Sequence, residues 1–313
     1  MPYSHHSHSG QFCRHATGNL EDVVLEAIRR GFEVYGLTEH VPRYRTVDLY
    51  PEEAGMDLQA LHEQFDAFIR EAHRLKTQYA SQITLLVGLE TDYITSIDLD
   101  QLESLLERNR GRVEYIVGSI HHVGGIPIDF DIDTFRKSLA QQPGRTENEQ
   151  MESFLCSYFD AQFQLFQRFH PEIIGHFDLC RLYHPEIRLS DYPRAWDLLK
   201  RNISYAVEYG ALFEVNAAAF RKHWNTAYPA EDILKVILDY GGRLALSDDS
   251  HGPHAVGLNY HRVLKYLRRE DVSELWLLQV CDSPNKAERN IQPVKAPDEW
   301  WNHSFWNKSS SYD

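Results

Sequence analysis

The chain has 313 residues, of which 42% are hydrophobic and 12% aromatic, and this composition favours a sizeable packed core over intrinsic disorder. The formal net charge of −14 argues against a general nucleic-acid binder, which needs a basic face. The four cysteines are far apart, so the sequence predicts neither a disulfide scaffold nor a thiolate zinc site. Without an apolar leader or a run approaching the ~20 residues that span a bilayer, we expect a soluble cytoplasmic protein.

Short apolar runs alternate with helical patterns along the whole chain, as in β-α units. The predicted strands are Pro2–His6, Glu33–Thr38, Ile83–Leu89, Val113–Ser119, Glu172–His176, Leu212–Asn216, Arg243–Ser247 and Glu274–Val280. Apolar spacing and end signals predict helices over Asn19–Arg30, Leu58–Tyr79, Glu147–Phe169, Tyr192–Tyr209, Ala230–Tyr240 and His254–Arg269.

Seven or eight β-α units in one series, without a linker between them, predict an α/β fold with a closed or distorted parallel barrel as a single domain. A doubly wound open sheet is the structural alternative. The polar segment Asp129–Gly144 is interpreted as a loop. We place the barrel in residues 1–282 and interpret residues 283–313 as a tail that straps over the surface and is poorly ordered at its end.

The 17 histidines of the chain are placed unevenly, and many follow the ends of predicted strands. In a parallel barrel the C-terminal strand ends share one face, which carries the active site. Imidazoles and carboxylates that converge there are typical ligands of divalent metals. The strand-end sequences, in chain order, are HSHS, TEH, GLE, GSIHH, GHFD, EVN and SDDSH.

Spacing supports this interpretation at both ends of the series. Residues two apart on a strand point to the same side, so His6 and His8 can hold one ion, as can Asp249 and His251. A single such pair is a weak signal, but seven consecutive strands that end this way are a strong one. A purification-tag remnant would be an unbroken histidine run, whereas serines interrupt this one.

The motifs HxHS, TEH, GLE, GSIHH, GHFD and SDDSH resemble those of the PHP (polymerase and histidinol phosphatase) family. The longer pieces TEHVPR, EVNAAAFRK and SDDSHGPHAVG are similar to the histidinol-phosphatases of the fungal and bacterial PHP type. The resemblance implies a distorted (β/α)7 barrel with a site for three divalent ions. Carried over residue by residue, it implies the metal ligands His6, His8, His15, His40, Glu90, His121, His176, Asp249 and His251.

Two positions depart from the simplest family pattern. His122 follows His121, so the ring that binds metal is open, and His121 is preferred. The final DxH is preceded by Asp248, which we expect to orient a ligand imidazole. Zinc, iron and manganese all suit a mixed set of histidines and carboxylates, so the identity of the metal stays open.

The resemblance implies hydrolysis of L-histidinol phosphate by in-line attack of a metal-bridging hydroxide. Arg181 and Arg221 are predicted to clamp the phosphate oxygens, with Lys222 as a less secure partner. The proton for the leaving oxygen comes from Asp249 and His251 or through water. Glu39, Asp178 and Glu214 are further candidates for facing the cavity, as substrate-binding or ligand-orienting groups.

Three alternatives remain at this point. The same scaffold can act on another small phosphate ester, a nucleotide or a nucleic-acid end, because metal ligands specify chemistry rather than substrate. A related metal enzyme can cleave C–N bonds, and a relic can bind without catalysis. We expect a small-molecule substrate, no nucleic-acid or membrane partner, and an oligomeric state that the sequence does not specify.

Overall fold

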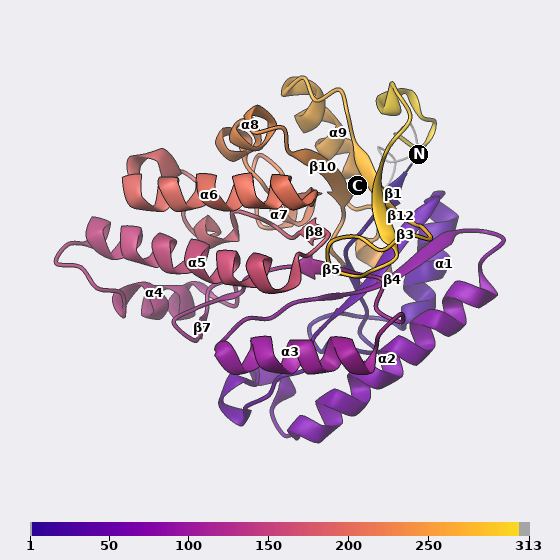
Figure 1. Cartoon of the computed structure of the whole chain (residues 1–313), viewed down its shortest axis with the longest axis horizontal. Coiled ribbons are helices and arrows are strands. Elements are labelled where there is room, and N and C mark those ends of the chain that lie inside the picture. Colours follow the sequence, from indigo (N-terminus) through magenta and orange to yellow (C-terminus); the bar gives the residue numbers. More distant parts are fainter. Residues whose placement is uncertain (1, 307–313) are drawn as a thin grey trace.

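The computed structural model describes residues 2–306, so the predicted disordered end of the tail, residues 307–313, lies outside the described residues. Its centre is a parallel sheet in which the strands follow one another around the molecule in chain order (Figure 1). The strands are β1 (Tyr3–Ser4), β3 (Val34–His40), β4 (Thr84–Glu90), β5 (Tyr115–Gly118), β8 (Ile173–Ile174), β9 (Leu212–Asn216) and β10 (Arg243–Ser247).

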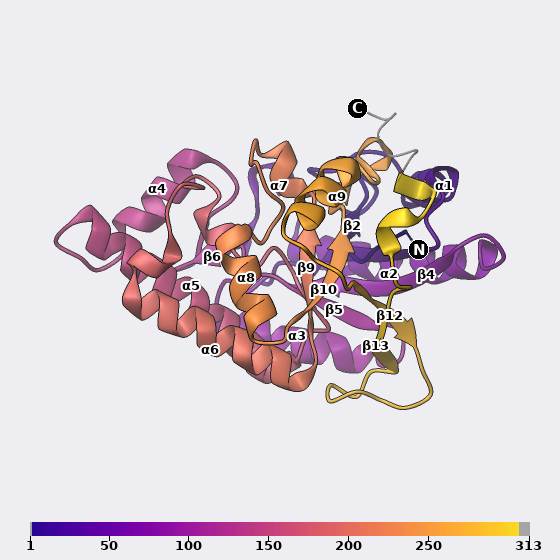
Figure 2. The same cartoon turned by 90° about the horizontal axis from the view of Figure 1, so that it is seen from above.

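The sheet curls until its last strand meets its first. The backbone N–H of His5 donates to the carbonyl of Leu246 at 3.3 Å, which brings β10 beside β1. The described residues therefore form a nearly closed parallel barrel of seven strands, as predicted, and not the doubly wound alternative. A second parallel pair, β2 (Ser7–His8) with β11 (Ser250–His251), extends this junction at the C-terminal face (Figure 2).

The barrel strands are buried on both faces, which is why their sequences are continuous hydrophobic runs. In β4 every residue after Thr84 is buried. Gly36 on β3 leaves room inside the barrel, because a Cβ there would collide with the Tyr115 hydroxyl. That hydroxyl instead donates to the His5 carbonyl at 2.8 Å, so one residue from β5 supports the chain at β1.

Helices cover the outside of the barrel (Figures 1 and 2). α1 begins with a reciprocal capping box between Asn19 and Asp22 and ends at Gly31 in the left-handed conformation, as its sequence predicts. The helices are α1 (Leu20–Arg30), α2 (Leu58–Gln78), α3 (Ser96–Arg108), α4 (Ile132–Ala140), α5 (Glu147–Phe169), α6 (Pro193–Tyr209), α7 (Ala218–Arg221), α8 (Glu231–Asp239) and α9 (Tyr260–Arg269).

The sequence prediction missed three helices, namely α3, α4 and the four-residue α7. The segment Asp129–Gly144, interpreted as a loop, contains α4, which is capped by the Asp131 carboxylate and buries Phe135 and Leu139. A short hairpin precedes it, formed by β6 (His122–Val123) and β7 (Ile126–Pro127). The helix α3 was not predicted, although its buried leucines recur every three residues.

The last predicted strand exists but does not belong to the barrel. β12 (Trp276–Val280) pairs antiparallel with β13 (Ile291–Lys295), so the predicted boundary at residue 282 falls inside a hairpin. The contacts that attach the hairpin to the barrel include two hydrogen bonds: the Tyr3 hydroxyl donates to the Trp276 carbonyl at 2.7 Å, and the Leu278 N–H donates to His5. No helix within residues 2–306 is long and apolar enough to cross a membrane.

Candidate metal centre

A cavity of about 370 Å³ opens at the C-terminal ends of the barrel strands. We call its strand-end residues the floor: His40, Glu90, His121, His176, Asp249 and His251, together with the buried His6 and His8 that touch them. We call the residues from longer connections the wall: Tyr50, Glu52, Asp129, Phe130, Leu179, Leu182, Arg221, Lys222 and Tyr228. The floor carries nearly all the predicted metal ligands.

Sheet register brings the floor residues together. In the β3–β4 pair His40 lies opposite Glu90, the last residue of each strand. In the β2–β11 pair His251 lies opposite His8. Because both pairs are parallel, side chains at matched positions point to the same side of the sheet. Strand pairing therefore brings residues of the distant HxH, GLE and DxH motifs into one cluster.

Glu90 is the centre of that cluster and is almost completely buried. Imidazoles from the N-terminal segment and from the ends of β3, β5 and β8 surround its two carboxylate oxygens. Nitrogen-to-oxygen distances of 3.0–3.3 Å join Glu90 to His6, His8, His40, His121 and His176.

Asp249 completes the floor opposite Glu90. Its Oδ1 atom lies 3.8 Å from Nε2 of His6 and 3.7 Å from Nε2 of His8. The residue has a left-handed φ of 47°, which an L-residue adopts only when its surroundings hold it. The Arg221 guanidinium provides that hold by donating to the carbonyls of Asp248 and Asp249 at 3.0 and 2.6 Å.

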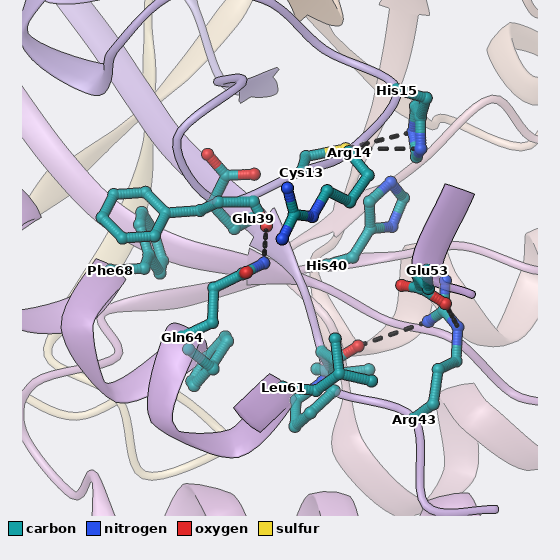
Figure 3. A pocket seen from close by; sticks show the side chains of 14 residues that line it. Cys13, Arg14, His15, Glu39, His40, Arg43, Glu53, Leu61, Gln64 and Phe68 are labelled. Atoms are coloured by element: carbon teal, nitrogen blue, oxygen red, sulfur yellow. Dashed lines mark hydrogen bonds and ion pairs between the residues drawn. The ribbon is translucent and has the colours of Figure 1, made fainter. Parts of the chain in front are cut away.

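His15 borders the cluster from the loop after β2. Its ring centroid lies 5.0 Å from that of His251 and 5.4 Å from that of His40. The Cys13 sulfur lies 3.2 Å from Nε2 of His15, and Figure 3 shows this contact beside His40 and the Arg43–Glu53 pair. His15 is thus the most exposed of the predicted ligands, at the edge rather than the centre.

Several ring nitrogens in the floor are buried and make no well-aligned hydrogen bond among the described residues, although those of His6, His8 and His40 that face Glu90 lie 3.0–3.3 Å from its oxygen. They include Nε2 of His6, Nε2 of His8 and both nitrogens of His40. An unpartnered buried polar atom is costly, and a cation at the convergence point would satisfy these lone pairs. Ligand atoms within 4.8 Å of one another come from His6–His8–Glu90, His8–Asp249–His251, His40–Asp92–His121 and His15–His40–His251. This donor set fits divalent metal ions.

The electrostatics of the floor agree with that fit at Glu90, His40 and His251, whereas at His6, His8 and His121 burial lowers the pKa but the neighbouring carboxylates outweigh it and raise the pKa. Burial raises the pKa of Glu90, but His6, His40 and His121 outweigh burial and hold this pKa well below its ordinary value. Burial, reinforced by His8, holds the pKa of His40 and of His251 well below the ordinary value for histidine. The carboxylate is therefore charged and these two imidazoles are neutral at pH 7, as metal ligands must be.

Sequence reasoning missed Asp92 as part of this site. Its Oδ1 atom lies 3.0 Å from Nδ1 of His121, and it forms a buried ion pair with Arg43. Although burial raises the pKa of Asp92, Arg43 and His121 hold it well below its ordinary value. The signal was present, because Asp92 follows Glu90 by two residues, the same spacing that linked His6 with His8.

Two acidic candidates orient histidines instead of lining the cavity. The Glu214 Oε1 atom lies 2.8 Å from Nδ1 of His6. The Glu39 carboxylate accepts bonds from the Ser9 backbone and hydroxyl, and its other oxygen lies 3.5 Å from Nδ1 of His8. Carboxylates in such positions fix the orientation of the ring so that its other nitrogen faces the metal.

The structure separates the two neighbouring histidines. His121 points Nε2 at Glu90, whereas His122 approaches only Asp92, at 3.7 Å, and lies beside the ring of Tyr50. Asp248 does not contact an imidazole, which differs from the expectation. Its carboxylate instead accepts bonds from Ser4, Tyr35 and the N–H of Gly257, and so ties the turn before Asp249 to the barrel.

Arg181 does not fit the predicted phosphate clamp. Its side chain is 2% exposed, lies outside the cavity lining and directs all its N–H groups at protein acceptors, namely Asp178, Asp232 and the Ile187 carbonyl. The Oδ2 atom of Asp178 accepts bonds from Arg181 and the Ala230 N–H. Arg221 and Lys222, in contrast, do line the cavity.

A family model described as a PHP domain matches residues 4–218, which is more than half of the chain. The chain belongs to the PHP domain family. A PHP relative in Schizosaccharomyces pombe, called a probable histidinol-phosphatase, is 47% identical over 89% of this chain and 90% of its own length. The histidinol-phosphatase of Saccharomyces cerevisiae is 30% identical over 97% of this chain and 99% of its own length.

Solved structures support the PHP fold. A putative histidinol phosphatase of Listeria monocytogenes superposes with a TM-score of 0.69 at 21% identity, covering 82% of this chain and 98% of that one. The histidinol phosphate phosphatase of Lactococcus lactis, solved with zinc, L-histidinol and phosphate, gives a TM-score of 0.61 at 20% identity and covers 88% and 95%.

Proposed function

We propose that this protein is a phosphoric monoester hydrolase that converts L-histidinol phosphate to L-histidinol and phosphate. The observation that carries this proposal is the floor, where five imidazoles surround the single buried carboxylate of Glu90 beneath a cavity that Arg221 and Lys222 also line. The curated relatives named histidinol-phosphatases support the choice of substrate.

The proposed cofactor is a set of three divalent ions, of zinc, iron or manganese. When bound, such ions lower the pKa of water and neutralise charge on a phosphoryl group. Glu90 and Asp249 supply the anionic oxygens, and Glu214 and Asp92 orient two of the rings. The proposed ligands are His6, His8, His15, His40, Glu90, His121, His176, Asp249 and His251.

Arg221 is the proposed phosphate clamp. Two of its five N–H donors hold the backbone carbonyls of Asp248 and Asp249, so the remaining donors can face the phosphate. The neighbouring Lys222 adds a second positive charge to the same cavity. Because the guanidinium also fixes the turn that carries Asp249, it links phosphate binding to the geometry of the floor.

The proton that the leaving oxygen needs is proposed to arrive through water. Asp249 and His251 were the other candidates. Burial raises the pKa of Asp249, but the surrounding His6, His251 and His8 hold it well below its ordinary value. The pKa of His251 is also held low, first by burial. Neither group therefore holds a proton to donate at neutral pH, and both are better suited to bind cations.

A panel of phosphate monoesters tests the proposal. Phosphate release is measured for L-histidinol phosphate, a nucleoside monophosphate, a sugar phosphate and p-nitrophenyl phosphate, with the metal content determined on the same sample. We expect bound divalent metal and a kcat/KM for L-histidinol phosphate that exceeds the others by a wide margin. A preference for the nucleotide would instead assign the site to another phosphoesterase, and a metal-free active enzyme would overturn the metal assignment.

A further inference from the structure

One acidic side chain in the wall has no role in the metal floor. Asp129 follows β7, lines the cavity and is half-buried there. Among the described residues no hydrogen bond or ion pair reaches its carboxylate, whereas most other buried acids of the site have one. A carboxylate held in a ligand cavity without a protein partner is available to a ligand.

The backbone around Asp129 is fixed from both sides. The preceding residue, Ile128, is fully buried, and its N–H donates to the His121 carbonyl at 2.9 Å. The Asp129 carbonyl accepts a bond from the Tyr183 hydroxyl at 3.4 Å. On the other side, Asp131 caps α4 by accepting from the Thr134 N–H at 2.7 Å. The carboxylate is therefore presented from a rigid segment, which reduces the entropy cost of binding.

The charges that face Asp129 come from four other segments, after β4, β5, β8 and α7. His121 and His176 on the floor and Lys222 on the wall favour its ionised form, whereas Asp92 opposes it. Burial is the largest influence and raises the pKa of Asp129 above its ordinary value. Lys222 acts on this carboxylate without forming an ion pair with it, so the carboxylate remains available to a cationic group of a ligand.

An aromatic surface adjoins this carboxylate. The rings of Tyr50 and Phe130 are stacked, with centroids 5.9 Å apart and planes 19° from parallel. Phe130 is 40% exposed although it is large and apolar. The ring of Tyr228 also lines the cavity. Flat apolar surface beside a carboxylate suits a ligand that carries a planar ring and a cationic nitrogen.

We propose that Asp129 binds the ammonium group of the substrate, while Phe130 packs against its flat ring. This inference rests on the proposed function and deepens it by naming the group that selects an amino-alcohol phosphate. The floor, Arg221 and Lys222 hold the phosphate end of the molecule, and Asp129 and Phe130 hold the other end. Metal ligands are common to many phosphatases, so the residues that discriminate between substrates lie in the wall.

The test compares Asp129→Asn with the parent enzyme on three substrates. These are L-histidinol phosphate, its analogue without the amino group, 3-(imidazol-4-yl)propyl phosphate, and its analogue without the imidazole, 2-aminopropyl phosphate. Because a charge-assisted hydrogen bond is lost, we expect kcat/KM to fall about 10- to 100-fold for the two amines. The value for the deamino analogue changes less than about 3-fold, since no such bond forms with it.

Two control variants separate this role from general effects. Glu147→Gln removes an exposed carboxylate from the first turn of α5, and Asp133→Asn removes one on the exposed surface of α4. Both should leave the ratio of amine to deamino substrate unchanged. The amount of bound metal should also be equal in Asp129→Asn and the parent protein.

The outcomes distinguish the inference from the proposed function. An equal loss on all three substrates, or a loss confined to the imidazole-bearing pair, overturns the role of Asp129 as the ammonium partner. If the parent enzyme itself shows no preference for L-histidinol phosphate in the earlier panel, the proposed function fails first. If that preference is present but Asp129→Asn keeps it, only the inference fails.

Discussion

The floor and the wall of the cavity are built in different ways. Each floor side chain stands on or beside a strand end and touches other floor residues, as His40 does with Glu90 at 3.0 Å. The wall residues come from long connections and touch one another mainly through ring faces, as Tyr50 and Phe130 do. The floor is therefore fixed by sheet register, and the wall by packing between segments that are distant in sequence.

This difference indicates separate roles, with metal binding in the floor and substrate selection in the wall. A floor set by hydrogen-bonded register holds ligand atoms to the tolerance that metal binding requires. A wall made from loops can change without disturbing the barrel, which is where enzymes of this architecture vary their substrates. Variants on the floor should therefore affect the chemistry itself, and variants on the wall should affect the choice of substrate.

The largest expected effect comes from the centre of the floor. In Glu90→Gln the side chain keeps its shape but loses the charge that five imidazoles share. We expect kcat/KM to fall at least about 10⁴-fold, because metal-ion catalysis supplies several kcal/mol of the barrier reduction. Bound metal, measured by mass spectrometry of the purified protein, should fall in parallel. Glu107→Gln, on the exposed surface of α3, is the control, and normal activity of Glu90→Gln would refute the central position of Glu90.

The floor was largely predictable because its signals are local. An apolar run followed by His, Glu or Asp marks a strand end, and parallel strand ends meet on one face. That logic places His6, Glu90 and Asp249 on one face of the barrel from their sequence positions alone. It missed Asp92, whose spacing from Glu90 carried the same signal, and it did not indicate that Arg181 bonds Asp178 and Asp232, because sequence does not show which acids will surround a guanidinium.

The next largest effect tests whether Arg181 belongs to the wall of the cavity. Arg181→Met should lower the free energy of unfolding by about 3–5 kcal/mol, because it leaves the buried Asp178 carboxylate without its partner. The kcat/KM of the folded fraction should stay within about 3-fold of the parent value, because Arg181 does not line the cavity. Denaturant titration and kinetics measure the two quantities.

A milder variant covers the case in which Arg181→Met does not fold. Asp232→Asn weakens the same network at its more exposed end, where the Asp232 side chain is 39% exposed. It should lower the melting temperature and leave KM unchanged. A rise of KM with unchanged stability in either variant would show instead that Arg181 contacts the substrate.

A smaller effect is expected for Asp92, which contacts the floor residue His121. Asp92→Asn removes the charge that orients His121 and pairs with Arg43. Loss of such an orienting carboxylate costs about 10- to 100-fold in metal affinity or activity. Competition with a chelator measures the affinity. The comparison with Glu90→Gln is informative, because equal losses in the two variants would show that Asp92 binds metal directly.

The smallest expected effect is a pH-dependent change in stability that comes from His5. His5 is fully buried, and its Nε2 accepts a bond from the Leu278 N–H at 3.0 Å. Burial lowers the pKa of His5 to about 3 from its ordinary 6.5. Between these values the unfolded chain takes up a proton that the folded chain does not, so stability falls as the pH falls.

Substitution of His5 isolates this contribution. From pH 7 to pH 5 the parent protein should lose about 2 kcal/mol of unfolding free energy through His5 alone, and His5→Gln should lose less by that amount. Denaturant titrations of metal-saturated protein measure the difference, with His73→Gln on α2 as the control. Equal pH dependence of His5→Gln and the parent protein would contradict the low pKa.

Apart from Arg221 and Lys222, the wall was not predictable from the sequence, for a physical reason. Asp129 and Phe130 lie in a segment whose polar composition suggested a loop, yet a hairpin and α4 hold them in place. Their position depends on Ile128 bonding to His121 and on Tyr183 bonding to Asp129, contacts between separate segments that no local pattern encodes. The strand β12 was predicted, but its pairing with β13 was not, because that pairing is antiparallel and outside the barrel series.

The central claim is that the floor binds divalent ions. The most direct measurement is anomalous X-ray diffraction from crystals of the purified protein at the absorption edges of zinc, iron and manganese. The account predicts anomalous peaks at coordinating distances of about 2.0–2.3 Å from Glu90 and from the imidazoles of His6 and His121. The absence of any such peak in the floor, in crystals whose protein hydrolyses L-histidinol phosphate, would contradict it.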